Sequence, residues 1–180
     1  IDYNAPVVLT FALAVIVVQL VSALLLPALI PTFFAVRSTF SFTNPLDYLR
    51  LVSHVLGHGS FAHLSSNLLF ILLLGPVLEE KYGSTAILSV ILVTALSTGL
   101  INVLFFPTRL MGASGVVFAF TILVSIVNVR RGTIPLSFLL VFVLFIGGEI
   151  LQGLTEDTIS QMAHIVGGII GAVYGFTSTR

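Results

Sequence analysis

The sequence predicts an all-α polytopic membrane protein, with six transmembrane helices in a single domain over residues 1–180. Two observations lead to this prediction. First, 57% of the residues are hydrophobic and only 8% are charged, whereas roughly a quarter of the residues of a soluble domain are charged. Second, apolar runs of about the 20 residues that cross a bilayer recur along the chain. The lipid bilayer is therefore an expected partner of this protein.

Six apolar runs are long enough to be spans, and residues that break helices or carry charge separate them. They cover about 6–26, 61–79, 85–105, 113–129, 134–151 and 160–177. The first run lacks a basic flank and is too long for a signal-peptide core, so we expect it to remain as a span. Because the sequence begins at Ile1 rather than Met, we also expect residues upstream of it.

The connection over about 27–60 is the only long one. It mixes several Phe residues with Arg and Asp. That composition favours a folded element lying at the membrane interface over a flexible linker.

Basic residues predict how the chain is oriented in the membrane. Four fall on one side of the six spans and three on the other: Lys81, Arg130, Arg131 and Arg180 against Arg37, Arg50 and Arg109. The side that carries the four basic residues is therefore predicted to be cytoplasmic. The second, fourth and sixth spans then all begin near the outer face, so their first turns share one depth. We expect a multi-pass protein of the cell membrane with a polar site near its outer face.

Several classes of function are disfavoured. The formal net charge is zero and no basic block is present, so nucleic acid is not an expected partner. The chain has no cysteine, so disulfides and thiolate metal sites are excluded. His54 and His58 form an H-x-x-x-H pair, but the Glu of zinc hydrolases is missing from it. We expect no metal and no cofactor, and we expect this histidine pair to shape the outer rim beneath the first loop.

Ser114 lies between two glycines at the start of the fourth span. A hydroxyl needs a nearby base to act as a nucleophile, and His164 is the one histidine that follows Ser114 in the chain. Small residues recur at four-residue spacing on both spans: Gly115 and Ala119 on the fourth, and Gly167, Gly171 and Gly175 on the sixth. Such residues let membrane helices approach closely. Packing alone would also explain them, but their position beside Ser114 and His164 favours a catalytic pair.

His63 and Asn67 are spaced i, i+4 and so share one face of the second span. Both can donate hydrogen bonds, which acyl transfer requires for the oxyanion of its tetrahedral intermediate. The backbone N–H of Ser114, at a helix N-terminus, is a further candidate donor. The alternative is that these side chains only satisfy buried carbonyls. Polar groups within a membrane indicate function by default, so the pattern favours a nucleophilic hydrolase.

Carboxylates lie within or beside two of the spans, at Glu149 and at Glu79-Glu80. Glu149 is near the outer end of the fifth span, where a third catalytic member is conceivable, but a polar residue on a movable helix is the favoured interpretation. Glu79 lies at the opposite, inner end of the second span, too far from Ser114 to take part in catalysis. We expect it to hold that helix or its turn in place.

Three motifs occur in order along the chain and together resemble those of the rhomboid intramembrane serine proteases. They are His54-x3-His58-x4-His63-x3-Asn67 with Glu79 twelve residues on, Gly112-Ala113-Ser114-Gly115, and Ala163-His164-x2-Gly167-x3-Gly171. The resemblance extends from about Arg50 to Gly175. Each motif alone is modest, whereas all three across six spans are specific.

The resemblance implies a rhomboid-like bundle with a Ser114–His164 dyad and no acidic third member. It implies an oxyanion and substrate-binding site that involves His63, Asn67 and Gly112, and a membrane-embedded first loop. It also implies a fifth helix that gates access. The substrates of the family are single-pass membrane proteins, cut in or near their transmembrane helix where helix-weakening residues allow unwinding.

The resemblance also assigns supporting roles, and the chain departs from the family pattern at two positions, Leu49 and Phe118. The supporting residues are Phe118, Gly167, Gly171, Glu79 and Arg50. The family often has Trp-Arg in the first loop, where this chain has Leu49-Arg50. A tyrosine usually follows the nucleophile by one turn and stacks on the base histidine. Phe118 stands there instead, so we expect the stacking to persist without the hydroxyl.

Two rival functions remain. A non-catalytic rhomboid-like protein would bind membrane clients with the same architecture, although such relatives usually lack the serine or the histidine. A small transporter would use the histidines as a proton relay. It predicts ionisable residues across the full membrane depth, whereas here they are expected in one outer layer.

Overall fold

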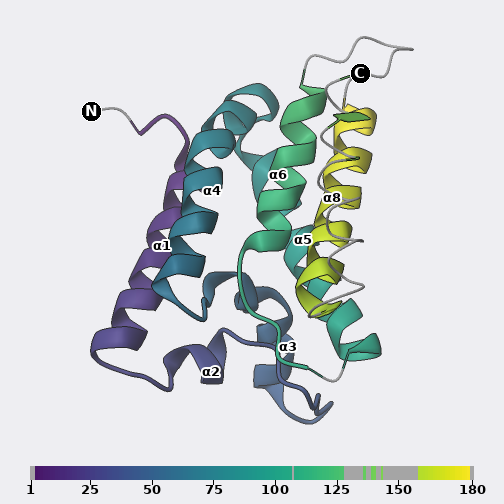
Figure 1. Cartoon of the computed structure of the whole chain (residues 1–180). Helices are drawn as coiled ribbons and strands as arrows, with labels where there is room; N and C mark the ends of the chain where they lie inside the picture. Colours follow the sequence, from purple (N-terminus) through teal and green to yellow (C-terminus); the bar gives the residue numbers. More distant parts are fainter. Residues whose placement is uncertain are drawn as a thin grey trace.

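The computed structural model describes residues 3–106, 108–127 and 158–178, together with the single positions 136, 139, 140 and 143. The named elements in this part of the chain are all helical, and they are α1 (Pro6–Leu24), α2 (Leu29–Phe33), α3 (Pro45–Ser53), the 3-10 turn η1 (His54–Leu56), α4 (Phe61–Tyr82), α5 (Ser84–Phe105), α6 (Ser114–Ile126) and α8 (Thr158–Ser178). The five long helices lie side by side, and α2 and α3 lie beneath their ends (Figure 1).

Five of the six expected spans correspond to these long helices. Three of them, α1, α4 and α5, are long and apolar enough to cross a membrane by length and composition. The helix α6 is shorter, with 13 residues. The fifth expected span, over 134–151, lies largely outside the described residues, as does Glu149, so the count of six stays a prediction.

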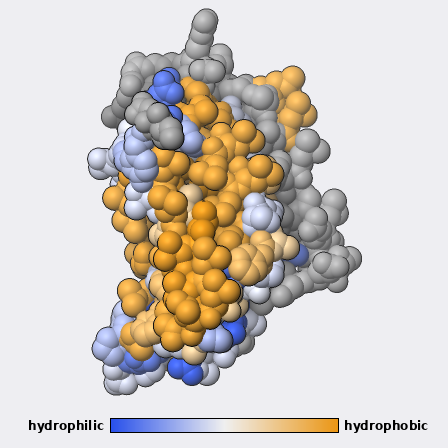
Figure 2. Space-filling model, turned by 90° about the vertical axis from the view of Figure 1, so that its left-hand side faces the viewer, coloured by the Kyte–Doolittle hydropathy of each residue, from blue (hydrophilic) through white to orange (hydrophobic). Residues whose placement is uncertain are grey.

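The long helices present apolar side chains outward. Only 33%, 28% and 44% of the residues in the apolar windows of α1, α4 and α5 are buried inside the protein. Large side chains such as Leu13, Val17, Leu69 and Leu96 are therefore exposed. Figure 2 shows this apolar surface across the middle of one face, with hydrophilic residues towards its ends. An apolar surface of this extent needs lipid around it, which identifies a membrane protein.

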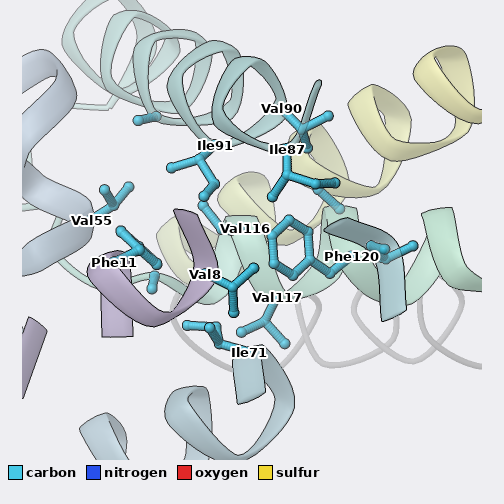
Figure 3. Packing of buried hydrophobic residues seen from close by; sticks show 14 of the residues in the cluster. Val8, Phe11, Val55, Ile71, Ile87, Val90, Ile91, Val116, Val117 and Phe120 are labelled. Carbon is cyan, nitrogen blue, oxygen red and sulfur yellow. The ribbon is translucent and has the colours of Figure 1, made fainter. Parts of the chain in front are cut away.

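The centre of the bundle is α6. Ten of its 13 residues are buried, because other helices contact it on several sides. Its Phe120 is fully buried in the main hydrophobic cluster with Val8 of α1, Ile71 of α4 and Ile87 of α5 (Figure 3). Residues at the start of α6 are consequently fixed relative to the rest of the bundle.

The buried carboxylate of Glu79 connects the end of α4 to the beginnings of α1 and α5. Glu79, near the end of α4, accepts hydrogen bonds from the backbone N–H groups of Val7 (3.0 Å) and Val8 (2.9 Å) and from the hydroxyl of Ser84 (2.6 Å). The first N–H groups of a helix have no partner within it, so Glu79 satisfies two of those of α1. Gly83, with φ +84°, makes the single-residue turn between α4 and α5.

The segment 27–60 packs against α5 through its third helix. Asn44 caps α3 by accepting a hydrogen bond from the backbone N–H of Leu46 (3.1 Å), and Pro45 begins the helix. A Cβ at Gly99 of α5 would lie 2.4 Å from the carbonyl oxygen of Leu51. Only glycine therefore permits this approach of α3 to α5. The location of the segment at the membrane interface stays a prediction.

Candidate active site

A small cavity lies between α4, α6 and α8 and has a volume of about 260 Å³. Eight residues from these three helices line it: His63, Ser66, Asn67, Phe70, Ser114, Val117, Phe118 and His164. The structure thus brings together four of the polar residues that the sequence singles out, namely Ser114, His164, His63 and Asn67. Their catalytic roles remain predictions, but their common location is a structural fact.

Ser114 is the first residue of α6, and a turn with a positive φ precedes it. Gly112 has φ +122°, a conformation that L side chains rarely adopt. A Cβ there would also lie 2.7 Å from Cε1 of His63. The backbone N–H of Gly112 donates to the carbonyl oxygen of His54 at 3.0 Å. Glycine at this position therefore lets the chain pass directly beside His63 before Ser114.

Helices α6 and α8 are in backbone contact, and this contact fixes the depth of His164. A Cβ on Gly167 would lie 2.0 Å from the carbonyl oxygen of Gly115, and a Cβ on Gly171 would lie 2.3 Å from that of Ala119. Real Cβ contacts are never this short, so both positions exclude every larger residue. The contact places the His164 turn of α8 beside the Ser114 turn of α6.

The ring of Phe118 stacks on the imidazole of His164. The two ring centroids are 4.1 Å apart and the planes are inclined by 4°. Phe118 lies one turn after Ser114 on α6, so a single helix presents both the hydroxyl and the surface on which the imidazole rests. This stacking restricts rotation of the imidazole about its side-chain bonds.

Asn67 is held by a residue whose role the sequence did not indicate. Its Nδ2 donates a hydrogen bond to Nε2 of His58 at 2.9 Å, and the backbone N–H of Ala113 donates to the same atom at 3.4 Å. The ring of His63 packs edge-on against that of His58 at 4.9 Å. His58 therefore contacts the two expected oxyanion donors and the peptide that precedes Ser114.

The expectation that His54 and His58 shape an outer rim is wrong, because their exposed fractions are 1% and 2%. Nε2 of His54 lies 3.0 Å from the carbonyl oxygen of Ala95 and 3.3 Å from the hydroxyl of Thr98. Burial lowers the pKa of both histidines to about 4, and the neighbouring His63 contributes to the shift at His58. Both are neutral at physiological pH, as an acceptor role for Nε2 of His58 requires.

A polar row along α5 also supports the site, and sequence reasoning missed it. Thr94, Thr98 and Asn102 are spaced i, i+4, i+8 and are at most 1% exposed. Nδ2 of Asn102 donates to the carbonyl oxygen of Thr108 at 3.0 Å, which holds the loop that leads to Ser114. The spacing of three polar residues in an apolar run could have indicated a buried face.

Arg50 lies away from the cavity, inside the segment 27–60. It is 3% exposed, its Nε donates to the carbonyl oxygen of Thr32 at 2.7 Å, and its Nη1 pairs with Asp47. Burial alone would raise the pKa of Asp47, but hydrogen bonds from Ser41 and Arg50 and the charge of Arg50 outweigh it and lower that pKa. The hydrogen bond from Arg50 to Thr32 joins α3 to α2.

The loop before Ser114 is tied to the first loop by an isolated antiparallel β-bridge. The backbone N–H of Val36 donates to the carbonyl oxygen of Leu110 at 2.9 Å, and that of Leu110 donates to Val36 at 3.2 Å. Both residues are buried together with Ala163 of α8. The bridge therefore connects the segment 27–60 to the chain on which Ser114 lies.

The fold and the cavity define a helical membrane protein in which a serine and a histidine from two packed helices line one polar pocket. Residues 45–180 match the family model of the rhomboid domain. Because this match covers most of the chain, the protein belongs to the rhomboid family.

Individual relatives are similar over about three quarters of the chain. The chain is 32% identical over 146 residues to the rhomboid protease GlpG of Yersinia pestis, with coverage of 76% of this chain and 51% of that protein. It is 28% identical over 134 residues to the rhomboid protease GlpG of Haemophilus influenzae, with coverage of 73% and 70%. It is 29% identical over 154 residues to rhomboid-like protein 11, chloroplastic, of Arabidopsis thaliana, with coverage of 77% and 55%. The chain thus spans about half the length of the first and third of these proteins.

Proposed function

We propose that this protein is an intramembrane serine endopeptidase that cleaves transmembrane segments of single-pass membrane proteins with a Ser114–His164 dyad. The observation that carries the proposal is the 260 Å³ cavity lined by both residues together with His63 and Asn67. Membership of the rhomboid family and the two relatives named rhomboid proteases support the same class of activity.

The first step is attack by the hydroxyl of Ser114 on the scissile carbonyl carbon. His164 accepts the hydroxyl proton as the new bond from Ser114 Oγ to that carbon forms. Stacking on Phe118 at 4.1 Å limits the orientations that the imidazole can adopt. That restriction favours proton transfer, because a base acts efficiently only when its geometry is already set.

The negative charge that develops on the carbonyl oxygen needs donors aimed at it. The candidates are His63, the second N–H of the Asn67 amide and the backbone N–H of Ser114 at the start of α6. The hydrogen bond from Asn67 to His58 uses only one of the two amide hydrogens. One such donor contributes about 10²–10³-fold to kcat.

The tetrahedral intermediate collapses when His164 gives its proton to the leaving nitrogen and the peptide C–N bond breaks. A water molecule then attacks the acyl-enzyme, again with His164 as base, and releases the second product together with free Ser114. The reaction consumes one water and needs no cofactor. No metal ion takes part in any of these steps.

The size of the cavity restricts the substrate. A helix is about 10–12 Å across with its side chains, which a cavity of about 260 Å³ cannot contain. Only an unwound segment can present a peptide bond to Ser114, so substrates need residues that weaken their transmembrane helix. With the orientation predicted from the basic residues, cleavage takes place near the outer face of the cell membrane.

The test uses purified protein with a panel of single-pass reporter substrates. Ser114→Ala and His164→Ala should each abolish cleavage, whereas Ser125→Ala on the same helix should retain it. Ser125 is a matched control because its hydroxyl donates to the carbonyl oxygen of Ile122 and is not part of the cavity lining. A fluorophosphonate probe should label Ser114 only.

Two results would contradict the proposal. Unchanged cleavage by Ser114→Ala would exclude this nucleophile. Binding of the reporters without detectable cleavage by the unsubstituted protein would favour the non-catalytic, client-binding alternative.

A further inference from the structure

A second, larger cavity lies between α1, the α3–η1 segment and α5. Its volume is about 600 Å³, within the range of about 300–1,000 Å³ that is typical of ligand sites. None of its lining residues belongs to the cavity that contains Ser114. It is therefore a separate feature of the fold, which we call the α1–α5 groove.

The α1–α5 groove has a closed floor and an open side. Phe11 of α1, Val55 of η1 and Ile91 of α5 form the floor and are at most 9% exposed. At the rim, Leu88 and Leu92 of α5 are each 45% exposed. A ligand could therefore enter from the side and still bury its far end against three elements.

The chemistry of the lining is almost wholly apolar, and its hydroxyl groups are already bonded. The Thr10 hydroxyl pairs with that of Tyr3 at 2.9 Å, and the Ser53 hydroxyl donates to the carbonyl oxygen of Phe33. The groove lining that the structure describes contains no charged side chain. A polar ligand would lose its hydration without gaining hydrogen bonds, so the groove suits a hydrocarbon ligand.

The open side of the groove continues into the lipid-facing surface. Both helices that border it, α1 and α5, are candidate membrane spans. Exposed side chains such as Leu13 and Val17 on α1 and Leu96 on α5 extend that surface. The surroundings of the opening are thus the hydrocarbon part of the bilayer, which supplies flexible chains narrow enough to enter.

We propose that the α1–α5 groove binds one acyl chain of a membrane lipid as a specific site. The bound chain contacts both neighbours of His54, since Ser53 and Val55 line the groove. The carbonyl oxygen of His54 in turn accepts the N–H of Gly112 at 3.0 Å. An acyl chain in the groove therefore supports, from the lipid side, the segment that holds the loop before Ser114.

The absence of tryptophan from the chain permits a direct test. Leu92→Trp places one fluorophore at the groove rim, and Leu100→Trp places one on the same helix, 41% exposed and outside the groove. Each variant is purified in detergent micelles and titrated with phosphatidylcholine that carries brominated acyl chains, which quench tryptophan. Half-quenching of Leu92→Trp should occur at a lipid fraction about tenfold lower than that for Leu100→Trp, equivalent to ~1.4 kcal/mol of selective binding.

A second substitution separates the groove from the surrounding surface. Ala14→Phe fills the groove and should remove the selective quenching of Leu92→Trp, whereas Leu13→Phe, at the adjacent exposed position, should preserve it. Leu88→Trp serves as the reporter if Leu92→Trp does not fold, as judged by its circular dichroism.

Three outcomes would overturn the proposal. The first is that both tryptophans are quenched in parallel, as contact with bulk lipid requires. The second is that Ala14→Phe leaves the quenching unchanged. The third is that a higher concentration of the protein itself, rather than lipid, protects the groove reporter, which would assign the groove to a second copy of the chain.

Discussion

Nε2 of His58 accepts a hydrogen bond from the side-chain amide of Asn67 at 2.9 Å. His58 lies in the segment that precedes α4, whereas Asn67 lies within α4. The backbone N–H of Ala113 approaches the same nitrogen at 3.4 Å. One imidazole thus sets the relative positions of a candidate oxyanion donor and of the peptide beside the candidate nucleophile. It has this effect without belonging to the lining of the cavity.

We therefore expect His58 to be a positioning residue. His58→Ala should lower kcat by about 10²-fold, the effect of losing one oriented oxyanion donor, with little change in KM. His58→Gln offers an acceptor oxygen to Asn67 and should recover part of the rate. Steady-state kinetics on a reporter substrate measure both constants. A loss of thermal stability in His58→Ala with unchanged kcat would indicate a purely structural role.

Acid should destabilise the protein well above the pH at which carboxylates titrate. The pKa of His54 and of His58 falls from 6.5 to about 4 on folding, chiefly because of burial. The unfolded chain then binds more protons than the native state between these values, so stability falls as pH decreases from 6.5 towards 4. The slope is about 1.4 kcal/mol per pH unit for each histidine.

Thermal unfolding measured across this pH range checks that slope. His54→Asn should give a shallower decrease than the unsubstituted protein, because one of the two buried histidines is gone. Asp47→Asn serves as the matched control: the pKa of Asp47 is lowered below 3.8, so it affects stability only at more acidic pH. A flat profile between pH 6.5 and 4 would contradict the burial argument.

The contact between α6 and α8 should tolerate no side chain at Gly167. Gly167→Ala puts a Cβ 2.0 Å from the carbonyl oxygen of Gly115, so the helices must separate. We expect a loss of about 1–3 kcal/mol in the free energy of unfolding and a large loss of cleavage. Gly175→Ala is the control on the same helix face, since its Cβ would meet side-chain atoms rather than backbone: Cδ1 of Ile126 at 3.0 Å, Cδ1 of Leu123 at 3.2 Å and Cβ of Ile126 at 3.3 Å. Equal behaviour of the two variants would mean that close packing does not fix His164.

The aromatic ring of Phe118, rather than the volume of its side chain, should determine its contribution to kcat. Phe118→Leu removes the surface stacked on His164 and should reduce kcat by about two- to tenfold, the equivalent of the ~0.5–1.5 kcal/mol of an aromatic pair. Phe118→Tyr keeps the ring and should retain at least the original rate. The rate of labelling of Ser114 by a fluorophosphonate gives a second reading of how well the base is oriented. A fully active Phe118→Leu enzyme would show that stacking is dispensable.

Features of the fold that depend on local sequence could be predicted. The apolar runs indicated α1, α4 and α5 to within a few residues, because a span must match the bilayer and its breakers are local. The four-residue spacing of Gly167 and Gly171 predicted that α8 approaches another helix closely, and the backbone of Gly115 and Ala119 is the surface that it meets.

Features that depend on the path of the chain could not be predicted. The burial of His58 involves contacts with residues distant from it in sequence, such as the backbone N–H of Ala113, 55 residues further along the chain. The same limit applies to the helices within 27–60, which are too short for a periodic pattern to indicate them. The sequence pattern therefore predicts an exposed histidine pair, whereas tertiary packing buries both residues.

Because Val36 pairs with Leu110 in a β-bridge, the chain should tolerate insertions after Val36 better than insertions directly before it. Extra residues inserted between Ser38 and Thr43 lengthen a largely exposed part of the loop and leave the pairing intact. One residue added between Ala35 and Val36 displaces Val36 from its position opposite Leu110 and so disrupts the bridge. A tag or a sensor domain is therefore better attached within the stretch between Ser38 and Thr43.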